Sequence, residues 1–161
     1  MGEQLEVQRL TPDSWRTYQE VRLAALREAP HAFGSTWERE AAMDEAAWRG
    51  RLSERAQFVA ISEEVVVGTA GGSSSDGSRT AWLVSLWVDP HWRGQGVGDH
   101  LVKVILAWAR TEGFEEVRLW VADGNREAER LYTRNGFGRT DAVQPIRVGE
   151  PRLEFEMTLS L

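Results

Sequence analysis

The stretch Ser85-Leu86-Trp87-Val88-Asp89-Pro90-His91-Trp92-Arg93-Gly94-Gln95-Gly96-Val97-Gly98 decides the fold predicted for this chain. The run over 81–88 is almost continuously apolar, which is typical of a strand buried on both faces of a sheet. Pro90 ends that strand because proline has no N–H to donate to the ladder. Apolar residues then recur at helical spacing, which predicts a helix over 97–112 that ends before Gly113.

A strand, a glycine-rich turn and a helix together predict an anion site. The first N–H groups of a helix lack intrahelical partners, and the aligned peptides place partial positive charge there. Glycines let the backbone curl and let an anion approach closely, and Arg93 adds a mobile charge, so a phosphate is the expected ligand. The spacing of Gly94, Gly96 and Gly98 is not Gly-x-Gly-x-x-Gly, and no Gly-Lys-Ser/Thr follows, which disfavours dinucleotide and nucleoside triphosphate loops. A flexible turn without a ligand is the alternative.

Two patterns in the sequence resemble those of the GNAT family of N-acetyltransferases. The stretch 93–98, entered from an apolar strand, resembles the coenzyme A signature of that family, Gln/Arg-x-x-Gly-x-Gly/Ala. A second family pattern, Asn-x-x-Ala-x-x-Leu-Tyr-x-x-x-Gly-Phe, is matched downstream by Asn125, Ala128, Leu131, Tyr132, Gly136 and Phe137. The resemblance is clearest from about residue 65 to residue 137.

Composition limits the class of protein. The 161 residues suit one domain over 1–161, and the absence of cysteine excludes disulfides, thiolate metal sites and cysteine nucleophiles. His31, His91 and His100 show no metal-ligand spacing, so no metal is expected. The net charge of −6 argues against nucleic acid as a partner. The chain has no apolar window of 18 residues and no signal peptide in its first residues, which predicts a cytoplasmic protein without a membrane partner.

The pattern along the chain predicts one mixed α/β sheet flanked by helices on both faces. Strands are expected at 5–10, 57–61, 65–70, 81–88, 116–121 and 153–161, with helices ending at Glu28 and spanning 38–52, 97–112 and 126–135. The polar stretch 71–78 is predicted to be a loop. The order βααβββαβαββ contains a central parallel β-α-β unit, and the last strand is expected to be antiparallel with one wet face.

The resemblance implies acetyl-CoA as co-substrate, with its pyrophosphate on the glycine turn and its pantetheine arm along the preceding strand. In the family the two parallel strands splay apart at their C-terminal ends, where open sheets bind ligands. The coenzyme-binding residues that it implies are Leu86, Trp87, Val88, Arg93, Gly94, Gln95, Gly96, Val97, Gly98, Asp99 and Asn125. Asn125 also suits a helix N-cap. Arg126, Arg130 and Arg134 share one helix face and either contact the adenosine phosphates or form a solvated surface.

For catalysis, the resemblance places Tyr132 as the general acid that protonates the leaving thiolate. The Val88 N–H is expected to stabilise the carbonyl oxygen as charge develops on it. Many relatives carry a glutamate base on one of the two splayed strands, but 81–88 and 117–121 contain none, and Trp120 stands where some protein-acetylating relatives have it. Water held by Ser85 and a loop carboxylate such as Glu38 could deprotonate the amine, or no dedicated base is needed; no base is assigned.

The predicted function is direct transfer of an acetyl group from acetyl-CoA to a primary amine of a small molecule. The absence of a cysteine acyl carrier favours the direct route. Arg22, Phe33 and Trp37 are candidates for contact with the acceptor. Two alternatives stay open: a CoA-binding sensor or interaction module without turnover, and an acetyltransferase of protein or peptide amines. A homodimer is open as an oligomeric state.

Overall fold

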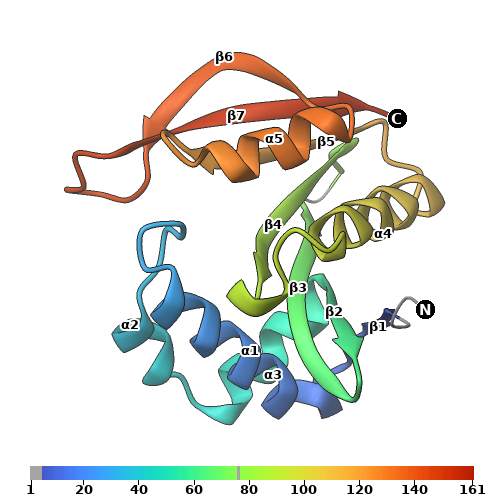
Figure 1. Ribbon diagram of the computed structural model, residues 1–161, viewed down its shortest axis with the longest axis vertical. Helices are drawn as coiled ribbons and strands as arrows, with labels where there is room; N and C mark the ends of the chain where they lie inside the picture. Colours follow the sequence, from blue (N-terminus) through green and yellow to red (C-terminus); the bar gives the residue numbers. More distant parts are fainter. Residues whose placement is uncertain (1–4, 76) are drawn as a thin grey trace.

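The computed structural model describes residues 5–75 and 77–161 (Figure 1). Residues 1–4, on which the predicted absence of a signal peptide partly rests, lie outside the described part of the chain. So does Asp76, which belongs to the predicted loop. The strands are β1 (Glu6–Arg9), β2 (Ala56–Ser62), β3 (Val65–Ser74), β4 (Thr80–Val88), β5 (Glu116–Ala122), β6 (Gly138–Pro145) and β7 (Leu153–Ser160). The helices are α1 (Trp15–Glu28), α2 (Trp37–Ala41), α3 (Glu45–Glu54), α4 (Val97–Thr111) and α5 (Arg126–Arg134).

The strands form one seven-stranded sheet in the order β1-β2-β3-β4-β5-β7-β6. The predicted helix cover on both faces is confirmed. The apolar side of α4, including Leu101 and Ile105, is fully buried in a core that also contains Leu131 of α5. The opposite face carries a second core, which contains Tyr18 of α1, Trp48 of α3 and Trp87 of β4. Among the described helices, none combines the length and the apolarity that crossing a membrane requires.

The central β4-α4-β5 unit is parallel, as predicted, and it opens at one end. The ladder between the two strands joins Thr80–Trp82 to Glu116–Arg118, and beyond these residues β4 and β5 separate. Because the ladder stops early, main-chain groups in the second half of β4 turn toward a gap instead of a neighbouring strand. Every other pairing in the sheet is antiparallel, including that of β7 with β5, which confirms the prediction for the last strand.

The single helix predicted over 38–52 is wrong, because two caps divide it into α2 and α3. The Thr36 hydroxyl accepts a hydrogen bond from the Arg39 N–H and starts α2. The Asp44 carboxylate accepts one from the Ala47 N–H and starts α3. Each cap satisfies an N–H that has no partner inside the helix, so an internal aspartate competes with continuation of the first helix.

The loop predicted over 71–78 is wrong in its first half, where β3 continues to Ser74. Gly71 and Gly72 lie within the ladder to β2 and β4. They serve close packing: a Cβ on Gly72 would come within 2.4 Å of the Trp108 ring of α4. Glycine therefore marks a point of close approach between strand and helix here, not a break in the strand.

Two burial predictions are corrected. β4 is not buried on both faces: Ala81, Leu83 and Trp87 are buried, and the other residues are partly open because the strand borders a cavity. The wet face of β7 is interrupted at Glu156, which is only 5% exposed. Arg118 of β5 and the Thr140 hydroxyl of β6 both donate to its carboxylate, so a charge can remain there under cover.

Candidate functional site

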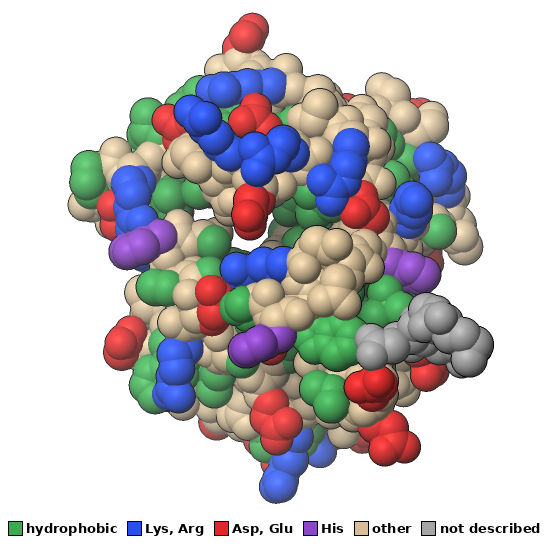
Figure 2. Space-filling view, viewed as in Figure 1, with side chains coloured by type: hydrophobic (Ala, Val, Ile, Leu, Met, Phe, Trp, Pro, Cys, Tyr) green, Lys and Arg blue, Asp and Glu red, His purple; other side chains and the backbone are tan. Residues whose placement is uncertain are grey.

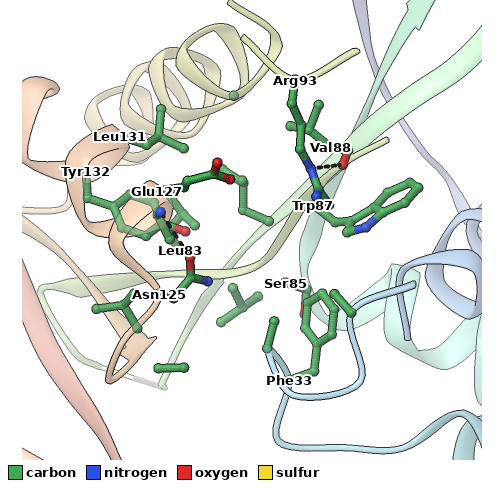
Figure 3. A pocket seen from close by; sticks show the side chains of 18 of the residues that line it. Phe33, Leu83, Ser85, Trp87, Val88, Arg93, Asn125, Glu127, Leu131 and Tyr132 are labelled. Carbon is green, nitrogen blue, oxygen red and sulfur yellow. Dashed lines mark hydrogen bonds between the residues drawn. The ribbon is translucent and has the colours of Figure 1, made fainter. Parts of the chain in front are cut away.

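A cavity of about 800 Å³ opens where β4 and β5 separate. It is bounded by the second half of β4, the start of α4, helix α5, and the loop after α1. The space-filling view is hollowed at this place, and Lys and Arg side chains gather over α5 above the hollow (Figure 2). In Figure 3, Tyr132 and Asn125 lie on one side of the cavity and Phe33 on the other. We call the first the α5 side; it is lined by residues 94 and 96–99, by Asn125 and by Tyr132. We call the second the Phe33 side; it is lined by Phe33, Trp82, Val84, Trp120 and Glu154.

The glycine turn presents bare backbone to the α5 side. Gly94 and Gly96 have φ values of +76° and +86°, a conformation that side chains rarely adopt. A Cβ at either residue would meet no protein atom within 4 Å, so the space beside them is open to a ligand. Gly96 is the N-cap of α4, and the first N–H groups of the helix follow directly. Gly98 has a different task, since a Cβ there would lie 3.0 Å from Leu131 of α5.

Arg93 is not the mobile charge that the sequence suggested. Its Nε donates to the Val88 carbonyl at 3.1 Å, and its Nη2 forms an ion pair with Glu28 of α1 (Figure 3 draws the first of these bonds). Glu28 also accepts from the Trp87 indole N–H at 2.9 Å. Arg93 lines the cavity while joining the ends of β4 and α1. Its guanidinium is therefore occupied by bonds that hold the turn in place.

Of the predicted coenzyme-binding residues, Gln95 is the one that does not line the cavity. Its side-chain amide donates to the His91 carbonyl at 3.1 Å and closes the turn from outside. The other predicted residues border the cavity together: Leu86, Trp87, Val88, Arg93, Gly94, Gly96, Val97, Gly98, Asp99 and Asn125. The structure therefore brings the predicted set together, with Gln95 in a supporting position.

Helix α5 carries the predicted proton donor. Asn125 caps this helix by accepting from the Ala128 N–H at 3.2 Å, which leaves its amide N–H groups beside the cavity. Tyr132 lines the cavity, is 6% exposed, and packs edge-on against the Phe137 ring. Burial raises the pKa of the Tyr132 hydroxyl well above its ordinary value of about 10. The hydroxyl thus keeps its proton throughout the physiological pH range.

The three arginines of α5 have different roles. Arg134 donates two 2.8 Å hydrogen bonds to Asp99, so it joins α5 to the first turn of α4. Its hydrogen bonds are the main reason why the pKa of Asp99 falls to about 2. Arg130 and Arg134 line the cavity, whereas Arg126 does not. Arg130 therefore lines the cavity and, unlike Arg134, does not bond Asp99.

A bulge in β4 reverses the direction of its side chains in the middle of the cavity wall. Ser85 has a φ of +58°, and the register with β3 shifts at this point. Before the bulge Leu83 packs toward α4; after it Leu86 and Val88 do so, while Trp87 turns toward α1. A non-glycine residue in this conformation is strained, and such strain tends to occur at functional sites.

The predicted acceptor residues separate in the structure. Phe33 and Arg22 line the cavity, with the Arg22 guanidinium 4.9 Å from the Phe33 ring centre. Arg22 is itself buried and forms a two-bond ion pair with Glu40. Trp37 does not line the cavity and instead stacks under Arg27. Ser85 lines the cavity wall, whereas Glu38 lies exposed in α2 and does not line the cavity, which disfavours Glu38 as the carboxylate of a water relay.

The sequence placed Phe33 in the site, but it did not identify Trp82, Glu127 or Glu154 as residues of the cavity wall. Trp82 and Trp120 stack there with ring centres 6.3 Å apart and planes 7° from parallel. Glu154, from β7, and Glu127, from the first turn of α5, also line the cavity. Alternation along β7 predicted that Glu154 is on the polar face, but only the pairing of β7 with β5 brings that face to the cavity.

A model of the Acetyltransferase (GNAT) family matches residues 12–137 of the chain. Human N-acetyltransferase 8B is 39% identical over 87 residues, which cover 52% of this chain and 38% of that protein. Mouse thialysine N-epsilon-acetyltransferase is 37% identical over 54 residues, which cover 34% of this chain and 32% of that protein. The matches therefore span less than half the length of these curated relatives.

The fold is also similar to that of solved acetyltransferases. The structure of yncA, a putative acetyltransferase from Salmonella typhimurium with its cofactor acetyl-CoA, superposes with a TM-score of 0.77. It is 23% identical in sequence, and the superposition covers 98% of this chain and 94% of that one. At this identity the likeness concerns the fold.

Proposed function

The chain belongs to the GNAT family of acetyltransferases, and on that premise we propose that it transfers the acetyl group of acetyl-CoA directly to a primary amine of a small molecule. One observation carries this proposal. The bare backbone at the start of α4, the gap between β4 and β5, and Tyr132 border one continuous cavity. That arrangement offers a phosphate site, a slot for an extended arm and a proton donor, one after another along the cavity.

The residues of the α5 side fit acetyl-CoA. The N–H groups at the start of α4 and the guanidinium of Arg130 suit its phosphates, and unpaired main-chain groups of β4 suit the amides of its pantetheine arm. When bound, the coenzyme supplies an activated acetyl thioester. Asn125 can donate from its amide to the same arm while its oxygen caps α5.

Tyr132 is the proposed proton donor to the leaving thiolate. A thiol has a pKa of about 8.5, and a buried tyrosine is a weaker acid than that. The tyrosine therefore holds its proton until the thiolate forms. Tyrosinate is a stronger base than a thiolate, so transfer of this proton to the sulfur is uphill and is completed as solvent reprotonates Tyr132. The raised pKa also means that ionisation of Tyr132 does not limit the rate below about pH 10.

A small acceptor is favoured because the Phe33 side is partly enclosed. Arg147, in the connection between β6 and β7, donates to the main-chain carbonyls of Phe33 and Ser35 and ties that connection to the loop after α1. One of the relatives takes its name from thialysine, a small-molecule amine. Without cysteine in the chain, a covalent acyl-cysteine route is excluded and direct transfer remains.

The proposed function is tested by measuring release of free thiol from acetyl-CoA with a panel of primary amines. Tyr132→Phe keeps the ring and is expected to lower kcat about 10²-fold or more, while acetyl-CoA affinity changes less than tenfold. Tyr18→Phe is the matched control, because Tyr18 is buried against Trp48 and does not line the cavity. Turnover that is unaffected in Tyr132→Phe removes Tyr132 from the mechanism. Tight binding of CoA without turnover of any amine favours the sensor alternative.

A further inference from the structure

The carboxylate of Glu154 lines the Phe33 side and has no role in the proposed function so far. Glu154 pairs with Ala122 of β5, so it lies on the same sheet face as Trp120, two residues earlier in that strand. Val121 and Leu119, which alternate with these residues, are buried in the core under α4. Glu154 thus projects from the face opposite α4 and α5, beside the gap at the end of β5.

Glu154 differs from Glu116 and Glu156, its neighbours on this face of the sheet, because no Lys or Arg of the described residues forms an ion pair with it. Its Oε1 accepts a 2.8 Å hydrogen bond from the Gln144 amide, and the described residues include no Lys or Arg in an ion pair with it. Glu116 and Glu156, on the same face, both bond Arg118. Burial raises the pKa of the Glu154 carboxyl, and the hydrogen bond from Gln144 offsets part of that rise.

The remaining charged groups of the cavity leave this region with unbalanced negative charge. The charged side chains that line it from other elements are Arg22, Arg93, Asp99, Glu127, Arg130 and Arg134. Arg22 is paired with Glu40, Arg93 with Glu28, and Arg134 with Asp99. Glu127 and Arg130 belong to α5, on the opposite side of the sheet from Glu154.

The indoles beside Glu154 complete a site for an organic cation. Trp82 pairs in register with Arg118, so it shares the face of Trp120 and Glu154, and the two indole rings stack in parallel. Indole faces attract cations, and a half-buried carboxylate attracts them more strongly. Phe33, on the facing loop, adds a third aromatic ring to this side.

Building on the proposed function, we infer that Glu154 binds the ammonium group of the acceptor and removes its proton, and that the acceptor is a cationic amine with an apolar or aromatic body. The ammonium lies against the Glu154 carboxylate, and the body lies against Trp82, Trp120 and Phe33. The acceptor therefore enters from the face opposite α5, and the acetyl group reaches it through the gap between β4 and β5.

Each turnover releases one net proton. The ammonium gives one proton to Glu154, and the freed nitrogen lone pair forms the C–N bond to the acetyl carbon as the C–S bond breaks. The leaving thiolate takes the proton of Tyr132. The nitrogen releases its second proton to solvent, solvent reprotonates Tyr132, and Glu154 returns its proton to solvent. The net products are the amide, the free thiol and one proton.

The test uses the full chain loaded with CoA and two probes of similar shape, phenethylamine and uncharged 2-phenylethanol. In calorimetry, phenethylamine is expected to bind the wild type at least tenfold more tightly than the alcohol. Glu154→Gln should abolish that preference and leave CoA affinity unchanged. Glu127→Gln, at the other unpaired carboxylate of the cavity, should retain the preference.

A second readout concerns proton removal. With acetyl-CoA and phenethylamine, Glu154→Gln is expected to lower kcat/KM at least 10²-fold and to remove the acidic limb of its pH profile. An unchanged charge preference in Glu154→Gln, or its loss in Glu127→Gln instead, overturns the assignment, as does failure of phenethylamine to bind the wild type. A charge preference that depends on Glu154 in a protein without turnover rejects the proposed function and keeps the amine site.

Discussion

Replacing Glu40 by Gln is expected to destabilise the protein by about 3 kcal/mol at pH 7. Glu40 is 1% exposed and accepts hydrogen bonds from Arg22 Nε and Nη2 at 2.9 Å and from Arg51 Nη1 at 2.7 Å. Burial alone would raise the pKa of this carboxyl, but the bonds and charge of Arg22, with Arg51, lower it from 4.5 to about 2. At about 1.4 kcal/mol per pKa unit, the fall of the pKa from 4.5 to about 2 corresponds to the loss of about 3 kcal/mol. Removing one partner of a buried ion pair costs about 3–5 kcal/mol in other proteins.

The loss should depend on pH with a definite sign. Because the folded pKa of Glu40 lies below its unfolded value, its contribution is complete above pH 4.5 and disappears as the pH falls through about 2. The wild type and Glu40→Gln should therefore differ fully at pH 7. Their difference should shrink to about 1 kcal/mol at pH 3.

Urea unfolding followed by tryptophan fluorescence at pH 7 and pH 3 measures both differences. Glu38→Gln, two residues away and exposed on the same helix, is the matched control and should change stability by less than about 0.5 kcal/mol. An equal difference between wild type and Glu40→Gln at the two pH values would refute the ionic explanation. Arg22, released from Glu40, would also lose its fixed place over Phe33, so acceptor KM should rise in the same variant.

Three further outcomes are expected. Gly96→Val, at a φ of +86°, should weaken CoA binding at least tenfold, about 1.4 kcal/mol, in a protein that still folds; unchanged affinity in calorimetry contradicts the phosphate site at the start of α4. Phe33→Leu should raise the acceptor KM with CoA affinity nearly unchanged, and the reverse pattern in steady-state kinetics contradicts the division of the cavity into two sides. Ser85→Val should cost more than about 1 kcal/mol in urea unfolding because a β-branched residue tolerates a φ of +58° poorly, whereas Ser85→Gly should stay within about 1 kcal/mol of wild type.

Much of the α5 side could be predicted because its residues are close in sequence. The glycine turn and the start of α4 are contiguous, and the conformation at Gly96 follows from the turn itself. Asn125 caps the short helix that carries Tyr132, so the spacing of the two residues in the sequence determines their relative positions once the helix forms. The parallel pairing of β4 and β5 follows in the same way from one strand-helix-strand unit.

The Phe33 side and the ion pairs that hold the site depend on tertiary structure. Arg93 looked mobile because its partner Glu28 lies 65 residues away, at the end of α1. Glu154 looked like an ordinary polar residue of an amphipathic strand, and it meets the cavity only because β7 inserts between β5 and β6. Local propensity and alternation specify which face of a strand is polar, but not which strand lies beside it. That choice is made by long-range packing of the whole sheet, which also decides that the polar face of β7 meets Trp120 and the gap beside β4.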